Sequence, residues 1–125
     1  MKLVKIIFNV AGVYGIAVLV PQYFLLDRIG QQSPPAITHS EYFYGFLGVA
    51  LAWQFMFFVI ARDPNRYRLA ILPAILEKLS FGFVACWLYA RGQLTIDLFT
   101  GGMFDLLFAA LFTLSFMRTR DPRQG

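Results

Sequence analysis

Charge is scarce in this chain. Only 14% of its 125 residues are Asp, Glu, Lys or Arg, whereas a typical soluble domain has about 25%. Hydrophobic residues make up 58% of the chain and aromatic residues 18%, and the core of so small a protein cannot bury that much apolar surface. The composition therefore excludes a water-soluble monomer, and the abundance of aromatic residues excludes a disordered chain.

Cysteine and histidine are equally scarce. A single cysteine, Cys86, excludes a disulfide framework, and a single histidine, His39, cannot build a histidine-rich metal site. We expect no metal site and no cofactor, because the sequence contains no haem, nucleotide or phosphate-binding motif. The net charge of +4 does not indicate nucleic acid as a partner, because the basic residues flank apolar segments, where membrane orientation and anionic lipid explain them.

Long apolar runs are what the sequence has instead. A bilayer core about 30 Å thick is crossed by roughly 20 predominantly apolar helical residues, and four segments are long enough. The predicted spans are residues 6–26, 42–61, 69–90 and 94–117. The sequence thus predicts an all-α protein, an integral membrane four-helix antiparallel bundle that forms a single domain over residues 1–125.

Basic residues outside the spans predict the orientation. Eight of them lie before the first span, between the second and third, or after the fourth, whereas Arg28 and Arg91 lie on the opposite side. Lys and Arg favour the cytoplasmic face. Both termini are therefore predicted to be cytoplasmic, with residues 27–41 as an outer loop and residues 118–125 as a basic cytoplasmic tail, in the inner (plasma) membrane of a bacterium.

Every predicted span also carries a polar side chain at membrane depth. At 1.5 Å of rise per residue, Asn9, Gln54, Glu77, Lys78 and Asp105 fall in the inner half of the bilayer or near its middle. Charged residues at such depth usually face the interior of a bundle and find partners there. These five residues are the candidates for binding a ligand or a proton, and none is assigned a catalytic role.

Small residues occupy the same helical stripes as two of these charges. They are Ala74, Gly82 and Ala85 around Lys78, and Gly101 and Ala109 around Asp105. Small residues let membrane helices approach closely, so we expect a Lys78–Asp105 ion pair between neighbouring antiparallel helices. Glu77 would then be left to Gln54, to Asn9 or to a proton. Pro21 and Pro73 predict kinks in the first and third spans.

Three segments carry a family resemblance. Residues 42–46 (YFYGF), 62–68 (RDPNRYR) and 76–82 (LEKLSFG) resemble uncharacterised small bacterial four-helix integral membrane proteins, whose general form is similar to the DoxX-like group. The resemblance implies a fold without an established activity. The length, four helices and one embedded Glu are also similar to the small multidrug resistance transporters, but their key Glu lies in the first helix, where this chain has Asn9.

Two interpretations of the buried charges stay open. Glu77, Lys78 and Asp105 either neutralise one another and hold the helices in register, or Glu77 stays free to exchange a proton or receive a cation. We predict a non-enzymatic accessory or small-solute or lipid-handling membrane protein. The alternatives are a proton-coupled transporter with Glu77 as carrier and a membrane enzyme using Glu77 or Asp105 as acid or base.

The expected partners follow from the same properties. The lipid bilayer is the first, and a small apolar or cationic molecule is the expected ligand. Four short helices should leave little internal volume, so a pathway for solute would need a homo-oligomer or a membrane partner protein.

Overall fold

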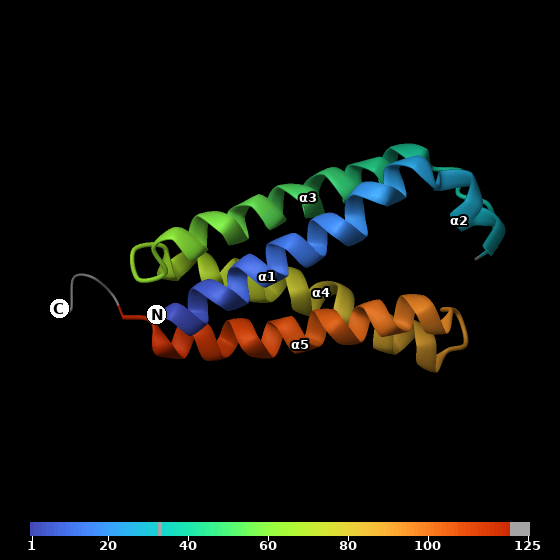
Figure 1. The fold of residues 1–125 in the computed structure, drawn as a ribbon. Helices are drawn as coiled ribbons and strands as arrows, with labels where there is room; N and C mark the ends of the chain where they lie inside the picture. Colours follow the sequence, from blue (N-terminus) through green and yellow to red (C-terminus); the bar gives the residue numbers. More distant parts are fainter. Residues whose placement is uncertain (33, 121–125) are drawn as a thin grey trace.

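The computed structural model describes residues 1–32 and 34–120, and this part of the chain contains helices and no strand. The helices are α1 (Lys2–Leu19), α2 (Leu26–Gln32), α3 (Ser40–Arg62), α4 (Ile71–Ala90) and α5 (Ile96–Arg118), with 3₁₀ turns at Val20–Phe24 and Arg68–Ala70. Four long helices run roughly along one axis, and α2 is a short element at one end of them (Figure 1).

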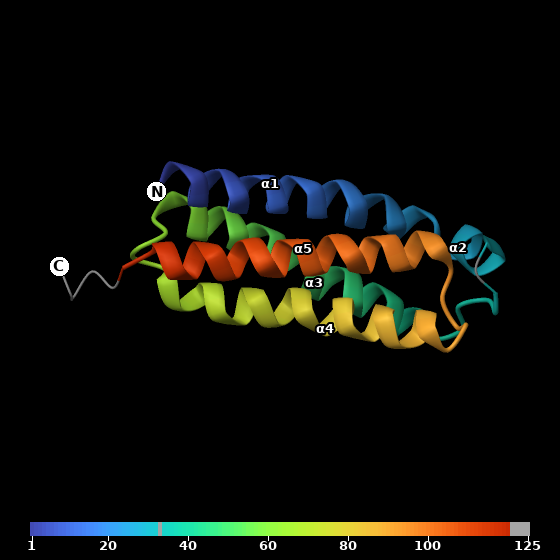
Figure 2. The ribbon, with the colours of Figure 1, turned by 90° about the horizontal axis from the view of Figure 1, so that it is seen from below.

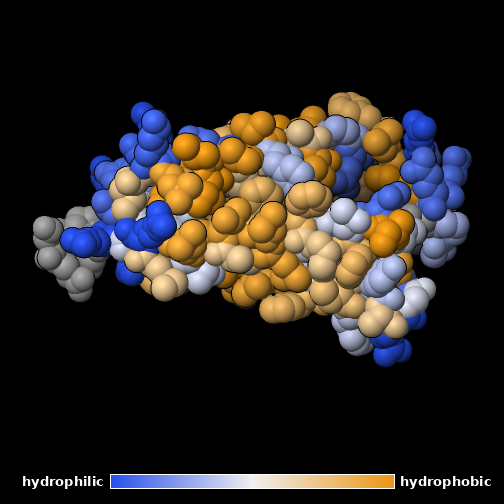
Figure 3. All heavy atoms as spheres, turned by 60° about the horizontal axis from the view of Figure 1, so that its bottom comes forward, coloured by the Kyte–Doolittle hydropathy of each residue, from blue (hydrophilic) through white to orange (hydrophobic). Residues whose placement is uncertain are grey.

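The four long helices confirm the four predicted spans. Together with the adjoining 3₁₀ turns they form four segments long and apolar enough to cross a membrane, over Lys2–Phe24, Ser40–Arg62, Arg68–Ala90 and Ile96–Arg118. On the face shown in Figure 3, apolar residues cover most of the middle of the bundle, and hydrophilic residues gather at both ends. Large apolar side chains outside the cavities, such as Val13 and Phe83, are exposed, as expected for a multi-pass membrane protein.

Two local features differ from the sequence expectation. The predicted outer loop at residues 27–41 begins with α2, a helix of seven residues, which is too short for hydrophobic periodicity to reveal. Pro73 gives no reason for the expected kink, because it lies in the first turn of α4, which begins at Ile71. The N–H groups of a first turn have no acceptor within the helix, so the missing N–H of a proline breaks no hydrogen bond there. At Pro21 the α-helix does give way to a 3₁₀ turn.

The long helices are arranged as two hairpins. The first hairpin is α1 packed along α3, and the second is α4 packed along α5, while contacts between the hairpins are far fewer. The two hairpins lie closest near the chain ends and diverge toward the end that carries α2 (Figure 1), and all four axes run roughly parallel in the perpendicular view (Figure 2). The bundle is therefore closed at one end and open at the other.

An aromatic cluster closes the narrow end. Phe8 of α1 stacks on Phe112 of α5 with ring centroids 4.3 Å apart, and Phe57 of α3 meets Phe112 edge-on at 5.0 Å. All three side chains are fully buried. Ile71 and Ala74 add α4 to the same core, so this cluster joins all four long helices.

Polar contacts hold the chain segments beyond this cluster. The Arg68 guanidinium donates to the Thr119 carbonyl at 3.2 Å and lies 3.8 Å over the Phe116 ring. The Arg120 N–H donates to Asn65 Oδ1 at 2.9 Å. The start of α1, the α3–α4 connection and the end of α5 share this end of the bundle (Figure 1). Of the predicted tail, residues 121–125 lie outside the described residues.

Candidate functional site

A cavity of about 890 Å³ lies between the two hairpins, in their diverging half. Its lining comes from α1, α3, α4 and α5, and small-molecule sites in proteins typically enclose about 300–1,000 Å³. The expectation that four helices leave little internal volume is therefore wrong for this bundle. The reason is geometric: the aromatic cluster holds the hairpins together at one end only.

The walls of the cavity are mostly apolar and its floor is polar. The apolar and aromatic lining residues include Val18, Leu19, Phe46, Val49, Trp53, Leu76, Phe81 and Leu98. Four of the five predicted site residues also line it, namely Gln54, Glu77, Lys78 and Asp105. From Asp97 at the open end of α5 to Asp105 the helix rises about 12 Å, so the polar groups lie well inside the bundle.

Lys78 lies at the centre of the floor. Its ammonium is 3.6 Å from Asp105 Oδ1 on α5 and 3.7 Å from Glu77 Oε2 on its own helix. The same ammonium lies 5.3 Å and 5.5 Å from the ring centroids of Phe57 and Phe108, which places it directly against the aromatic cluster. The expected Lys78–Asp105 pair is present, and it includes Glu77 as a third member.

This trio differs from the expected arrangement in the position of Glu77. Glu77 was expected to be left to Gln54, to Asn9 or to a proton, and consecutive helical residues do point about 100° apart. The long lysine side chain instead carries its ammonium back within reach of Glu77 Oε2. The contact is longer than a hydrogen bond, and Glu77 Oε2 has no hydrogen-bond donor among residues 1–32 and 34–120.

Gln54 is placed by its own helix and by α1. Its side chain is 1% exposed, and its amide Nε2 donates to the Ala50 carbonyl at 2.7 Å. Its Oε1 is buried and finds no donor in the described part of the chain. A Cβ atom added to Gly15 would overlap this oxygen, so the glycine makes room for the amide at the hairpin interface.

Asn9 is not brought to the other candidates. Its side chain is exposed and it does not line the cavity, because it lies about 200° around α1 from Ala11, which is fully buried. The polar residue that α1 contributes is Tyr14, which lines the cavity and packs on Phe108 with centroids 5.4 Å apart. The small residues Ala11, Gly12 and Gly15 are buried on α1, and their spacing in the sequence would have indicated that this side of the helix, and not the side of Asn9, faces the bundle.

Glycines mark where the helices touch and where they do not. Added Cβ atoms at Gly82 and Gly102 would overlap Leu106 and Ala85 in the α4–α5 interface. Added Cβ atoms at Gly45 and Gly101 would meet nothing within 4 Å, and both glycines line the cavity. The space around them is therefore open.

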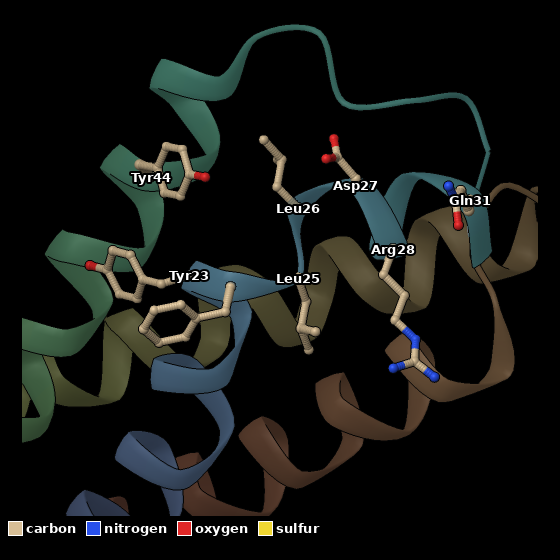
Figure 4. Close-up of a pocket in the computed structure, with 8 residues that line it drawn as sticks. Tyr23, Leu25, Leu26, Asp27, Arg28, Gln31 and Tyr44 are labelled. Carbon is tan, nitrogen blue, oxygen red and sulfur yellow. The ribbon is translucent and has the colours of Figure 1, made fainter.

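A second hollow of about 520 Å³ lies near α2. It is bordered by Tyr23 and Tyr44, whose rings stack with centroids 6.0 Å apart. Asp27 and Arg28 extend to opposite sides of the chain here (Figure 4). This open surface hollow gathers no cluster of buried polar groups, so the cavity between the hairpins is the better candidate site.

Comparison with known proteins assigns no family and no function to this chain. No family model, curated protein or solved structure matches the chain. Within the described residues, no group of three or more His, Cys, Asp or Glu side chains is placed to hold a metal ion. The site is therefore argued from its own residues.

Proposed function

We propose that this protein is a non-enzymatic membrane protein that handles a small amphipathic solute or lipid in the cavity between its two hairpins. The observation that carries this proposal is the lining of the cavity, in which mostly apolar walls surround a cluster of four polar residues inside the bundle, Gln54, Glu77, Lys78 and Asp105. A molecule with an apolar body and a polar head matches that combination, because apolar pockets with a few placed polar groups are the usual form of a ligand site.

The proposed setting is the inner (plasma) membrane of a bacterium, with both termini cytoplasmic. The basic residues at the closed end of the bundle support this orientation, since Lys and Arg favour the cytoplasmic side. The cavity would then open toward the outer half of the bilayer. It lies within one chain, so a homo-oligomer or a membrane partner is not needed to create it, and the likeness to the DoxX-like group stays a prediction.

The experiment uses Gly101, which lines the cavity with open space beyond its Cα. Native mass spectrometry of the protein extracted in mild detergent should show an amphiphile bound in a one-to-one complex. Gly101→Leu should remove most of that complex because the new side chain enters the cavity. Thr100→Leu is the matched control, since Thr100 is the preceding residue of α5 and is exposed.

Two outcomes would overturn the proposal. One is the same bound species, in the same amount, on Gly101→Leu and Thr100→Leu. The other is the absence of any bound amphiphile on protein extracted without added lipid.

A specific observation also favours a second function, a proton-coupled transporter with Glu77 as carrier. Glu77 lines the cavity and its side chain is 22% exposed, so a proton or a substrate in the cavity can reach this carboxylate. In that case Glu77→Gln should abolish substrate-linked proton release from the purified protein. Unchanged release would eliminate the carrier role.

A further inference from the structure

The cavity floor carries more acceptors than donors. Glu77 and Asp105 each present a carboxylate, and the one ammonium near them, that of Lys78, lies against both. Gln54 adds nothing to this acceptor surface, because its Oε1 is fully buried against Gly15 of α1 and its amide already donates to Ala50. Hydrogen bonds and ion pairs to a carboxylate are strong, so a ligand that supplies donors and positive charge would be favoured beside the partly exposed Glu77 and Asp105 side chains.

Exposure separates the two signs of charge at the floor. The Lys78 side chain is 5% exposed, whereas those of Glu77 and Asp105 are 22% and 18% exposed. The ammonium is thus enclosed between the carboxylates and the aromatic cluster, and the carboxylates are the groups that a molecule in the cavity meets. An anionic head group would have to pass them to reach Lys78.

The wall leading to the floor has the same sign. Asp97 lines the open end of the cavity on α5, and in the described residues Lys78 is the one basic side chain against three carboxylates in the lining. The chain as a whole carries a net charge of +4, so its cavity is opposite in sign to the rest of the molecule. A cleft lined by one sign of charge concentrates ligands of the other sign.

Aromatic rings complete the surroundings. Tyr14, Trp53 and Phe81 line the same cavity as the carboxylates. The face of an aromatic ring attracts a cation, Trp most strongly, and ring-lined sites recognise quaternary ammonium groups in particular. The walls therefore favour the same class of ligand as the floor.

We infer that the cavity selects a lipophilic organic cation, an amine or quaternary ammonium with a compact apolar body, and binds its charged head at Glu77 and Asp105. This inference rests on the proposed function and specifies its ligand. The apolar body would occupy the diverging half of the bundle, between Val18 of α1 and Leu98 of α5, and the head would lie beside Lys78 without displacing it.

The test uses four probes that share one apolar body. They are 1-adamantylammonium, its N-trimethyl derivative, 1-adamantanol and 1-adamantanecarboxylate, added at neutral pH to the full chain in maltoside micelles. The readout is the indole resonance of the two tryptophans in ¹H–¹⁵N spectra. Trp53 lines the cavity, and Trp87 is exposed on α4 outside it, so Trp87 reports partition into the micelle.

Both cationic probes should shift the Trp53 resonance saturably and leave Trp87 nearly unchanged. The carboxylate should bind at least ten-fold more weakly than 1-adamantylammonium. Glu77→Gln should weaken binding of the cation by at least ten-fold and Asp97→Asn by a smaller factor. Glu41→Gln is the control, because it removes the same charge from an exposed residue outside the cavity.

The relative affinities of the two cations distinguish the sources of recognition. Tighter binding of the N-trimethyl probe indicates that the rings dominate, and tighter binding of the primary ammonium indicates that hydrogen bonds to the carboxylates dominate. Either order supports the inference. Two measurements do not depend on the folding of Glu77→Gln. One is the effect of Asp97→Asn at the exposed rim, and the other is the comparison of the probes on the unmodified protein.

Equal binding of cation and carboxylate would overturn the inference. If that equal binding were lost in Gly101→Leu, the cavity would still be an amphiphile site and the proposed function would stand. A Trp53 resonance that no probe shifts would overturn the inference, and the mass-spectrometric experiment above would then decide the proposed function by itself. Equal effects of Glu77→Gln and Glu41→Gln would also contradict it.

Discussion

The Lys78 ammonium on α4 lies 3.6 Å from Asp105 Oδ1 on α5. This pair joins the two helices of the second hairpin at the point where the cavity floor meets the aromatic cluster. The pair therefore contributes both to the packing of α4 against α5 and to the polar lining of the cavity. Substitutions can test its contribution to packing.

Exchanging the two charges tests the pair directly. Lys78→Asp or Asp105→Lys alone leaves like charges facing each other, and breaking a buried pair typically costs about 3–5 kcal/mol. The double variant Lys78→Asp with Asp105→Lys should recover part of that loss because opposite charges face each other again. Unfolding monitored in detergent measures the three free energies, and a double variant no more stable than the worse single variant would contradict the pairing.

Adjacent glycines on α5 should respond in opposite ways to the same substitution. Gly102→Val should destabilise the protein by about 1–3 kcal/mol, the usual cost of overpacking an interface, because its Cβ would overlap Ala85. Gly101→Val should cost far less, since an added Cβ there meets nothing within 4 Å. Thermal unfolding of the two purified variants gives the comparison, and equal losses would mean that α4 and α5 do not pack as described.

The aromatic cluster should dominate the stability of the closed end. Phe112 is fully buried and stacks on Phe8, so Phe112→Ala should cost about 3–5 kcal/mol. Phe83→Ala is the control, because the Phe83 side chain on α4 is 61% exposed and faces away from the core. Titration with a denaturing detergent should separate the two variants, and similar midpoints would show that the cluster does not hold the hairpins together.

Labelling tests the proposed orientation. In a Cys86→Ser background, cysteines at Lys2 and Arg66 should be protected from a membrane-impermeant maleimide in intact cells, and a cysteine at Gln93 should react. The first two positions share the closed end of the bundle, and Gln93 lies in the α4–α5 connection (Figure 1). Permeabilised cells, in which all three should react, provide the control.

Two other labelling patterns would be informative. Reaction at Lys2 and Arg66 with protection at Gln93 would reverse the orientation and leave the fold intact. Different outcomes at Lys2 and Arg66 would contradict the fold, because the structure places both at one end.

The four long helices and the inward face of α4 follow from the sequence. Apolar segments of about 20 residues have few alternatives to a membrane-spanning helix, so every predicted span is found within a few residues of its expected bounds. The stripe of Ala74, Lys78, Gly82 and Ala85 is buried as its spacing predicts. Periodicity specifies such a face because it depends on one helix alone.

The rest was decided by how the helices meet. Asn9 and Gln54 are both single amides in apolar helices, yet one is exposed and the other is 1% exposed, because the rotation of each helix depends on what its neighbours pack against. The cavity likewise needs two hairpins that touch through Phe8, Phe57 and Phe112 at one end and diverge at the other. Distances between helices are set by pairs of surfaces, so only the tertiary structure opens the space that Glu77 and Lys78 line.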